Sequence, residues 1–371
     1  MTSHKKGAIA SQTIAELIQS GFIMGATEDN VRPASLDLSI SDEVYSVGGV
    51  FQPRPGETVR EVLELIDKKK HDLKSPLQRE QMYIARLNET LELPETVYAF
   101  CNPKSTTGRL DIHVRLIADG VPRYDSVTPG GWKGELWVSI VPKTFPIKVA
   151  PGQSLNQLRF FNADTRLDQL ELEMAMKRDK LLWNPENKKP YLYEELLVRD
   201  NDDSLILSLD GMNDLIGYRG RIGDTPIDLA KIGGYDPKDF FEPVEKDNGY
   251  IYLKQNEFYI LSTREAVKVQ PTLACEMAPM DERSGEFRSH YAGFIDPGWG
   301  YGKEGEGNGR PLTLEVRPFE DLVARDGQPI AKIRFERVTE TPDQNYDQLD
   351  SNYSVQSGPR LAKQFKAPKN K

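Results

Sequence analysis

The chain has 371 residues, of which 38% are hydrophobic and 28% are charged, as expected of a soluble globular protein of about two domains. The formal net charge of −9 excludes nucleic acid as the main partner, because binding a phosphate backbone requires a basic surface. The sequence has no signal-peptide pattern and no apolar run long enough to span a bilayer, so we expect no membrane partner. Cys101 and Cys275 are too few for a disulfide framework and lack metal-ligand spacing, which favours buried thiols in a reducing cytoplasm.

The first predicted element is a short helix, in which Thr13 and Glu16 form a capping box. Residues 31–40 alternate as a strand, and residues 56–72 have the composition of an inserted charged helix. From residue 83 to residue 161, short alternating runs are broken by proline and glycine, which is typical of an all-β domain.

Helix-forming residues then fill positions 164–182, and we expect residues 163–200 to form a helical connector. The connector would separate a β-domain at 1–162 from a second β-domain at 201–340. Residues 341–371, rich in Asn, Gln, Ser and Lys, predict a mobile tail. The expected fold class is therefore mainly β, with two domains and a few short helices.

Three motifs occur twice in the same order, which indicates two copies of one β-domain with different insertions. Gly, Gln, Arg and Phe are identical in the longest repeat, whose two copies start at 152 and 327. The repeated stretches are Gly152–Phe160 with Gly327–Phe335, Ser35–Ile40 with Ser204–Leu209, and Pro129–Trp132 with Pro297–Trp299.

The second copy carries a candidate general base. Residues 292–299, Ala-Gly-Phe-Ile-Asp-Pro-Gly-Trp, predict a tight turn that presents Asp296. Residues 312–316 then alternate as a half-buried strand, which places the carboxylate of Glu315 on a rigid element, as a general base requires. The alternative is an ordinary hairpin with a solvated Glu315. The matching position of the first copy is Ser139, so that copy lacks the carboxylate.

Each copy also has a turn of the form Lys/Arg-Ser-x-x-x-Arg, at Lys104–Arg109 and at Arg283–Arg288. A cation, a hydroxyl and a guanidinium that converge at one turn can bind phosphate oxygens. A solvated surface loop is the alternative for either turn.

Together these motifs resemble the dCTP deaminases of the dUTPase-like superfamily. The matching stretches are Arg32–Asp37, the two phosphate turns, residues 292–299, Thr313–Glu315, Gly327-Gln328 and Tyr353–Gln356. The resemblance implies two tandem dUTPase-like β-barrel or β-clip domains, of which the first is degenerate. The chain departs from the family pattern in its imperfect phosphate turns, in the insert Tyr301–Arg310 and at Ser139.

The resemblance implies hydrolytic deamination of dCTP to dUTP and ammonia, which feeds dUMP and dTTP synthesis. Glu315 would be the base, with Arg288 or Arg109 and Ser284 or Ser105 as its helpers. No cofactor or metal would take part in the chemistry, although Mg²⁺ could be bound by the triphosphate of the substrate. Substrate-binding positions implied by the family are Lys104, Ser105, Thr106, Arg109, Arg283, Ala292, Asp296, Thr313, Leu314, Tyr346, Tyr353 and Gln356.

Within that resemblance, Asp296 would hold the deoxyribose, and the tail would close over the triphosphate. The family also implies a homo-oligomer, with a homotrimer favoured because threefold rings of domains need a domain count divisible by three. Whether the first-copy or the second-copy turn serves Glu315 stays open, and so does inhibition by dTTP.

Other classes were weighed on the same residues. A zinc deaminase needs His-x-Glu with Pro-Cys-x-x-Cys, and none of the four histidines is followed two residues on by Glu. Residues 300–305 match GxGxxG but lie in a β-domain without a following helix pattern, so a dinucleotide site is not expected. A dUTP pyrophosphatase, a bifunctional relative and a non-catalytic nucleotide-binding regulatory module remain as alternatives.

Overall fold

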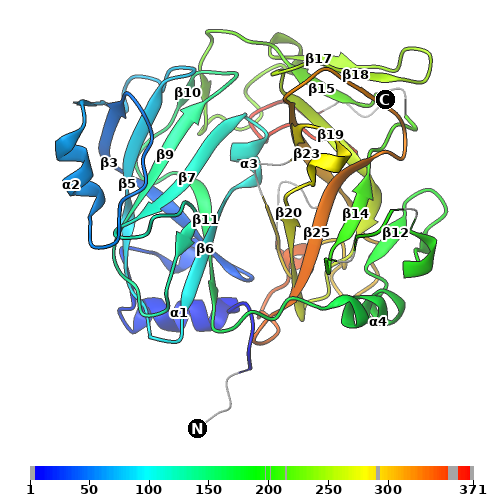
Figure 1. Cartoon of the computed structure of the whole chain (residues 1–371), viewed down its shortest axis with the longest axis horizontal. Coiled ribbons are helices and arrows are strands. Elements are labelled where there is room, and N and C mark those ends of the chain that lie inside the picture. The colour runs from blue at the N-terminus through cyan, green and yellow to red at the C-terminus, as the bar shows by residue number, and fades with distance from the viewer. Residues whose placement is uncertain are drawn as a thin grey trace. The chain divides into compact units, whose positions relative to one another are not determined.

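The computed structural model describes residues 5–196, 198–200, 202–213, 215–289, 293–349 and 358–367. These residues are mainly β, with short helices between the strands (Figure 1). The α-helices are α1 (Ser11–Gln19), α2 (Val59–Leu65), α3 (Ser105–Gly108) and α4 (Gln169–Asp179). In the described part of the chain, none of the helices is long and apolar enough to cross a membrane.

The chain divides into two compact units. Unit 1 contains residues 5–7, 164–221 and 237–361, and unit 2 contains residues 8–163, 222–236 and 362–367, among the described positions. Two segments of the second half of the sequence, 222–236 and 362–367, therefore belong to unit 2. In place of the mobile tail expected from 341 onward, residues 341–349 pack in unit 1, and Ala362, Gln364 and Phe365 are buried in unit 2.

Unit 2 is built on one large antiparallel sheet with the strand order β7-β9-β5-β3-β11-β6-β8. Its long strand β3 pairs with β11 through Leu36–Ser39 and with β5 from Ile40 onward, and the register shifts between Ile40 and Val44. The strands of this unit are β1 (Ile23–Met24), β2 (Val31–Arg32), β3 (Ser35–Val47), β4 (Lys68–Lys70), β5 (Met82–Glu92), β6 (Tyr98–Pro103), β7 (Ile112–Ala118), β8 (Ser126–Val127), β9 (Lys133–Pro142), β10 (Ile147–Lys148), β11 (Ser154–Phe161) and β16 (Ile227–Asp228).

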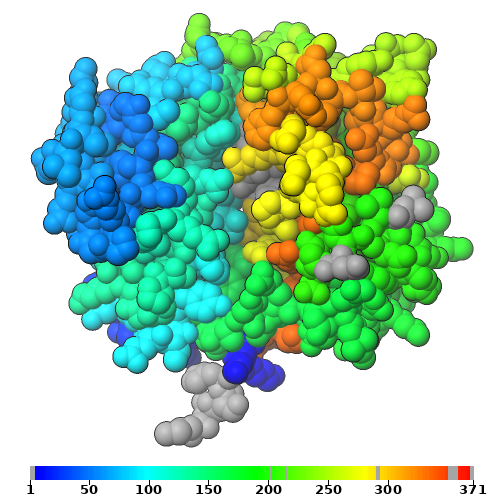
Figure 2. Space-filling view, in the orientation of Figure 1, coloured from blue at the N-terminus to red at the C-terminus, as the bar shows by residue number. Residues whose placement is uncertain are grey.

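The helix expected at 56–72 is shorter in the structure. It covers only α2, because Lys68–Lys70 instead form β4 against Tyr45–Val47 of β3. A capping box of Thr58 and Glu61 starts the helix. Figure 2 shows this part of unit 2, in blue, at the molecular surface.

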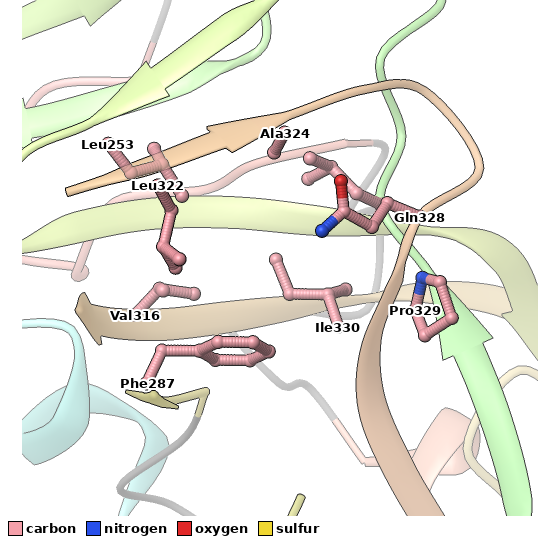
Figure 3. Close-up of a pocket in the computed structure, with 9 residues that line it drawn as sticks. Leu253, Phe287, Val316, Leu322, Ala324, Gln328, Pro329 and Ile330 are labelled. Carbon is pink, nitrogen blue, oxygen red and sulfur yellow. The ribbon is translucent and has the colours of Figure 1, made fainter. Parts of the chain in front are cut away.

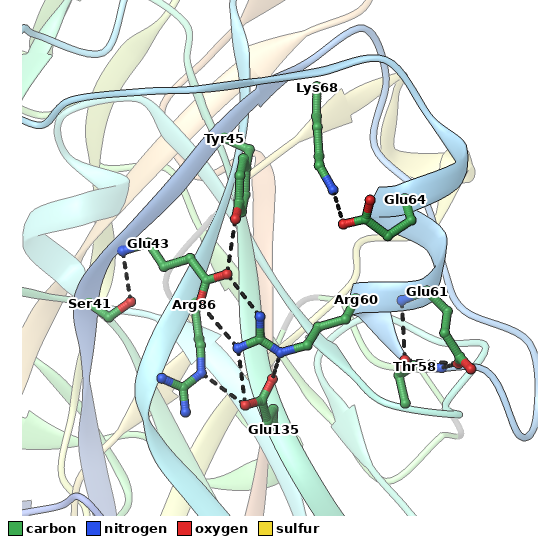
Figure 4. Close-up of polar contacts among 10 residues, drawn as sticks. All are labelled: Ser41, Glu43, Tyr45, Thr58, Arg60, Glu61, Glu64, Lys68, Arg86 and Glu135. Atoms are coloured by element: carbon green, nitrogen blue, oxygen red, sulfur yellow. Dashed lines mark hydrogen bonds and ion pairs between the residues drawn. The ribbon is translucent and has the colours of Figure 1, made fainter.

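An ion-pair cluster holds α2 against the sheet of unit 2. The Arg60 guanidinium donates to Glu43 at 2.9 Å and to Glu135 at 2.7 Å (Figure 4). It also lies over the ring of the buried Trp137. Arg86 from β5 also donates to Glu135 at 3.1 Å. These charges are half-exposed, so the cluster orders the insert more than it stabilises the fold.

Unit 1 has a sheet with the strand order β13-β12-β19-β15-β17, in which β23 also pairs with β19 and with β21. A second sheet has the order β14-β25-β20-β22, and β18 pairs with β24 as a separate two-stranded sheet. The strands are β12 (Leu182–Asn184), β13 (Lys189–Pro190), β14 (Leu205–Ser208), β15 (Gly217–Gly220), β17 (Phe241–Val244), β18 (Ile251–Leu253), β19 (Tyr259–Val267), β20 (Leu273–Ala278), β21 (Phe287–Arg288), β22 (Phe294–Ile295), β23 (Arg310–Pro318), β24 (Leu322–Ala324) and β25 (Pro329–Arg337).

The segment expected as a connector is part of unit 1. Helix α4 starts at its cap Asp168, four residues later than the start expected at 164, and buries Leu172 and Met176 in the core of this unit. Strand β12 then joins the main sheet by pairing with β19. Residues 164–196 are therefore not a separate linker, because their apolar side chains complete the core of unit 1.

Corresponding strands of the two units pair in the same way. Strand β11 lies between β3 and β6, and β25, which carries the repeated sequence, lies between β14 and β20. Each unit also buries a matching pair: Glu89 accepts hydrogen bonds from the N–H and hydroxyl of Ser39, and Glu265 accepts them from Ser208. These correspondences support the duplication that we infer from the sequence.

Candidate active site

Glu315 lies in the middle of β23, where its Cα pairs with that of Ile260 on β19. Glu315 is 2% exposed, so the alternative of a solvated surface glutamate is wrong. Neighbouring side chains on a strand point to opposite faces, and Leu314 and Val316 both enter the core of unit 1. Glu315 therefore projects from the other face of the sheet.

Arg288 occupies the same face as Glu315. The short strand β21 pairs with β23 so that Arg288 lies opposite Arg317, and directly paired residues of an antiparallel sheet share a face. Arg317 lies two residues after Glu315 and so also projects to that side. The sequence reasoning missed Arg317, although its position at Glu315 plus two was a usable signal. Its guanidinium donates to the carbonyl of Asn256.

The neighbours of Glu315 on β23 have different roles. Thr313 shares its face, and the Thr313 hydroxyl oxygen accepts a hydrogen bond from the Arg360 N–H at 3.3 Å. Residues 358–361 therefore reach this side of the strand, which the sequence reasoning did not foresee. The Leu314 side chain is fully buried in the core on the opposite face, so any substrate contact there would come from its backbone.

Asp296 sits, half-buried, at the start of the Pro297-Gly298-Trp299 turn. The turn is closed by the Trp299 N–H, which donates to the Asp296 carbonyl at 3.2 Å. Tyr346 supports the turn: its N–H donates to the Pro297 carbonyl at 2.8 Å, and its ring lies 5.1 Å from that of Trp299. Tyr346 is partly buried against the core of unit 1, and its expected position over the triphosphate stays a prediction. Three other predicted site residues, Ala292, Tyr353 and Gln356, lie outside the described residues.

The second-copy turn is surrounded by carboxylates. Arg283 donates twice to Asp281, at 2.7 Å for both contacts, and lies 3.9 Å from Asp200. The Arg283 guanidinium and N–H hold the pKa of the Asp281 carboxyl well below its usual range. The Arg283 side chain is 74% exposed, and Figure 2 shows this stretch of chain in yellow on the surface. Ser284, beside it, is half-buried.

Two further carboxylates near this turn, those of Asp200 and Asp202, form ion pairs with cations of β25. Lys332, itself buried, pairs with Asp200 at 2.5 Å and with Asp202 at 3.1 Å. Arg334 pairs with Asp202 at 3.1 Å. The three carboxylates here, Asp200, Asp202 and Asp281, therefore balance the three cations Arg283, Lys332 and Arg334.

The first-copy turn has a cationic surplus. Lys104 precedes α3, and its ammonium pairs with the buried Asp37, which also accepts from Arg32 at 2.9 Å. Lys363 adds a third cation: burial lowers its pKa, and Lys104 lowers it further, which places the two cations near each other. The sequence motif Arg32–Asp37 could have indicated this cluster, whereas Lys363 had no local signal.

The remaining residues of this turn are anchored differently. Ser105 and Thr106 are half-buried at the start of α3, while Arg109 is only 3% exposed. The Thr107 hydroxyl donates to the Leu155 carbonyl at 2.6 Å and ties the helix to β11 of unit 2. Within the described residues, no group of three or more His, Cys, Asp or Glu side chains is placed to hold a metal ion.

Unit 1 thus brings together Glu315, Thr313 and Arg288 on one strand face, and unit 2 holds the Lys104 turn. A mainly β chain with a buried strand carboxylate, an Asp-Pro-Gly turn and a cationic turn carries the features by which the sequence resembles the dUTPase-like superfamily. Comparisons with known proteins identify the family within this class.

Residues 5–164 match the 2'-deoxycytidine 5'-triphosphate deaminase (DCD) N-terminal domain, and residues 178–365 match the C-terminal domain of the same family. Among solved structures, the chain is similar to 2'-deoxycytidine 5'-triphosphate deaminase from Agrobacterium tumefaciens, with 35% identity and a TM-score of 0.81. That match covers 91% of this chain and 100% of the other. A search of curated proteins finds no match. The chain therefore belongs to the dCTP deaminase family, and both the resemblance and the mainly β fold class are confirmed.

Proposed function

We propose that the protein hydrolyses the exocyclic C–N bond of dCTP to give dUTP and ammonia, with Glu315 as the general base. The observation that carries this proposal is the position of Glu315, buried on β23 and sharing a strand face with Arg288. A base held on a rigid strand can stay within reach of one water and one substrate atom. Membership of the dCTP deaminase family supports the choice of substrate.

In the proposed reaction, Glu315 takes a proton from a water molecule as its oxygen bonds to C4 of the cytosine. That proton passes to N3 as the C4–N3 double bond becomes single. The proton of the new C4 hydroxyl then passes to the exocyclic nitrogen, the bond from C4 to that nitrogen breaks, ammonia leaves, and C4 becomes a carbonyl carbon. Arg288 and Ser284 would orient the water and stabilise the charge that develops in the transition state. Because Arg317 shares the same face, it is a further candidate for that electrostatic role.

We propose that the triphosphate is bound by the Lys104 turn rather than by the Arg283 turn. The support is the local charge of each turn taken by itself: three cations surround one carboxylate at Lys104, whereas cations and carboxylates balance at Arg283. A triphosphate needs uncompensated cations, because each carboxylate in the site repels it. Mg²⁺ would accompany the phosphates as part of the substrate.

The test is a panel of cytosine and uracil nucleotides given to the purified full chain, with ammonia and pyrophosphate both measured. Ammonia release from dCTP supports the proposal. Pyrophosphate release from dUTP without ammonia would indicate a dUTP pyrophosphatase, and nucleotide binding without either product would indicate a regulatory module. Addition of dTTP to the dCTP reaction tests whether it inhibits.

We also propose that the protein is a cytoplasmic homotrimer. The reasoning is that threefold rings of repeated domains close when three two-copy chains assemble. Light scattering should then give a mass three times that of the 42.0 kDa chain. A monomeric mass at working concentrations would overturn the threefold arrangement, while leaving the ammonia assay to decide the activity.

A further inference from the structure

An apolar cavity lies in unit 1 directly behind the strand that carries Glu315. Its lining comes from β23, from the β18–β24 sheet and from the start of β25, and the side chain of Phe287 enters it (Figure 3). Val316, Leu322 and Ile330 face the Phe287 ring region, and Gln328 is the one polar side chain in the described lining. The cavity is therefore apolar, and the Phe287 ring forms part of its wall.

This cavity touches the immediate neighbours of two proposed catalytic groups. Phe287 precedes Arg288 on β21, and Val316 follows Glu315 on β23. Because successive strand residues point to opposite faces, Phe287 and Val316 enter the cavity while Arg288 and Glu315 project from the other side. Because Phe287 and Arg288 are consecutive on β21, a movement of the Phe287 ring would also move the backbone of Arg288.

The backbone pairing of this part of the chain with β23 is short. Strand β21 has two residues, and its register pairs are Phe287 with Pro318 and Arg288 with Arg317. One more backbone hydrogen bond joins the Phe319 N–H to the Glu286 carbonyl at 2.7 Å. The preceding turn folds over the same ring, since a Cβ on Gly285 would lie 3.3 Å from the Phe287 ring. Packing of the Phe287 ring against the core of unit 1 is therefore one side-chain anchor of the 284–288 turn.

We propose that Phe287 is a positioning residue, whose insertion into this apolar cavity fixes the Arg288 guanidinium beside Glu315. The inference rests on the proposed deamination, in which Arg288 orients the attacking water. A turn that is free to shift by about 1 Å can lower the rate of the chemical step by roughly a hundredfold, because productive geometry is lost. Phe287 itself would touch neither the substrate nor the water.

The test compares Phe287→Ala with Leu253→Ala. Both substitutions remove apolar volume from the same cavity, but Leu253 lies on β18, which pairs with β24 in a separate two-stranded sheet. We expect both variants to melt at a lower temperature than wild type. Phe287→Ala should lose kcat about ten- to a hundredfold with little change in KM for dCTP, whereas Leu253→Ala should keep kcat within about threefold. Phe287→Leu, which keeps an apolar side chain, should recover most of the lost kcat.

Equal kcat values for Phe287→Ala and Leu253→Ala would overturn the inference and leave the proposed function intact. A wild-type protein that releases no ammonia would instead overturn the proposed function. In that case hydrogen exchange at the Phe319 amide still measures how firmly the turn is held, because this amide donates to the Glu286 carbonyl. Faster exchange in Phe287→Ala than in Leu253→Ala supports the anchoring role of Phe287, and equal exchange in the two variants overturns it.

Discussion

Replacing Lys104 by alanine tests which of the two turns binds the triphosphate. In unit 2, Lys104 and Arg32 share one ion-pair partner, Asp37, and Lys363 lies close to Lys104, so cations outnumber carboxylates at this turn. Arg283 in unit 1, in contrast, is held by Asp281 and has two further carboxylates nearby. The same substitution to alanine should therefore have unequal effects at the two turns.

The size of the effect follows from the contact that is lost. A charge-assisted hydrogen bond to phosphate is worth about 1.5–3 kcal/mol, which corresponds to roughly a ten- to a hundredfold rise in KM. The Lys104 side chain is 29% exposed, and solvent screens it in part, so the lower half of that range, about ten- to thirtyfold, is expected. Arg283→Ala should raise KM by less than about threefold, since its charge is already paired with Asp281.

The assay is the KM for dCTP, measured by ammonia release for Lys104→Ala, Arg283→Ala and the control Lys133→Ala. Lys133 is a 66% exposed lysine of unit 2 that pairs with Glu92, so the control removes the same charge away from the turn. The two turn variants should differ in KM while kcat stays similar. An unchanged KM in Lys104→Ala, together with a large rise in Arg283→Ala, would refute the charge argument.

Two further predictions concern stability. Gly298→Ala should lower the free energy of unfolding by about 1–3 kcal/mol, because φ at Gly298 is +90° and the new Cβ would lie 2.4 Å from Asn345. Gly152 also has a positive φ, but the space around it is open. Gly152→Ala should therefore lower the free energy of unfolding by less. Denaturant titration of the two variants checks this order, and a smaller loss for Gly298→Ala would contradict it. Burial raises the pKa of the Glu265 carboxyl above its ordinary 4.5, so the folded state binds the extra proton and loses stability as the pH rises above that value. The unfolding free energy of Glu265→Gln, relative to wild type, should therefore increase between about pH 4 and pH 7, and a flat or falling difference would argue against this origin.

The elements that the sequence predicts well are those set by local pattern. Alternation at 312–316 is enough to place Glu315 on a strand with Leu314 on its core side, because the period of two leaves one register for the apolar residues. The Asp-Pro-Gly turn is equally local, since a proline and a positive-φ glycine determine it. Membership of the family also depends on these motifs.

What the sequence does not predict depends on tertiary pairing. Lys68–Lys70 have helical composition, yet pairing with β3 makes them a strand. Residues 362–367 have the composition of a polar tail, but Ala362 and Phe365 are buried in unit 2. The neighbouring sequence gives no sign of this burial, because the residues that cover them are distant in the chain. Arg317 and the Phe287 cavity are likewise visible only once β21 is aligned with β23.

The most direct test of the central claim is turnover of dCTP by Glu315→Gln beside binding of dCTP by the same variant. The substitution keeps the shape of the side chain and removes its ability to accept a proton. Ammonia release should fall by about a hundredfold or more in kcat, while calorimetry gives a dCTP affinity within about threefold of wild type. A Glu315→Gln protein that still releases ammonia at a near-normal rate would show that another group is the base.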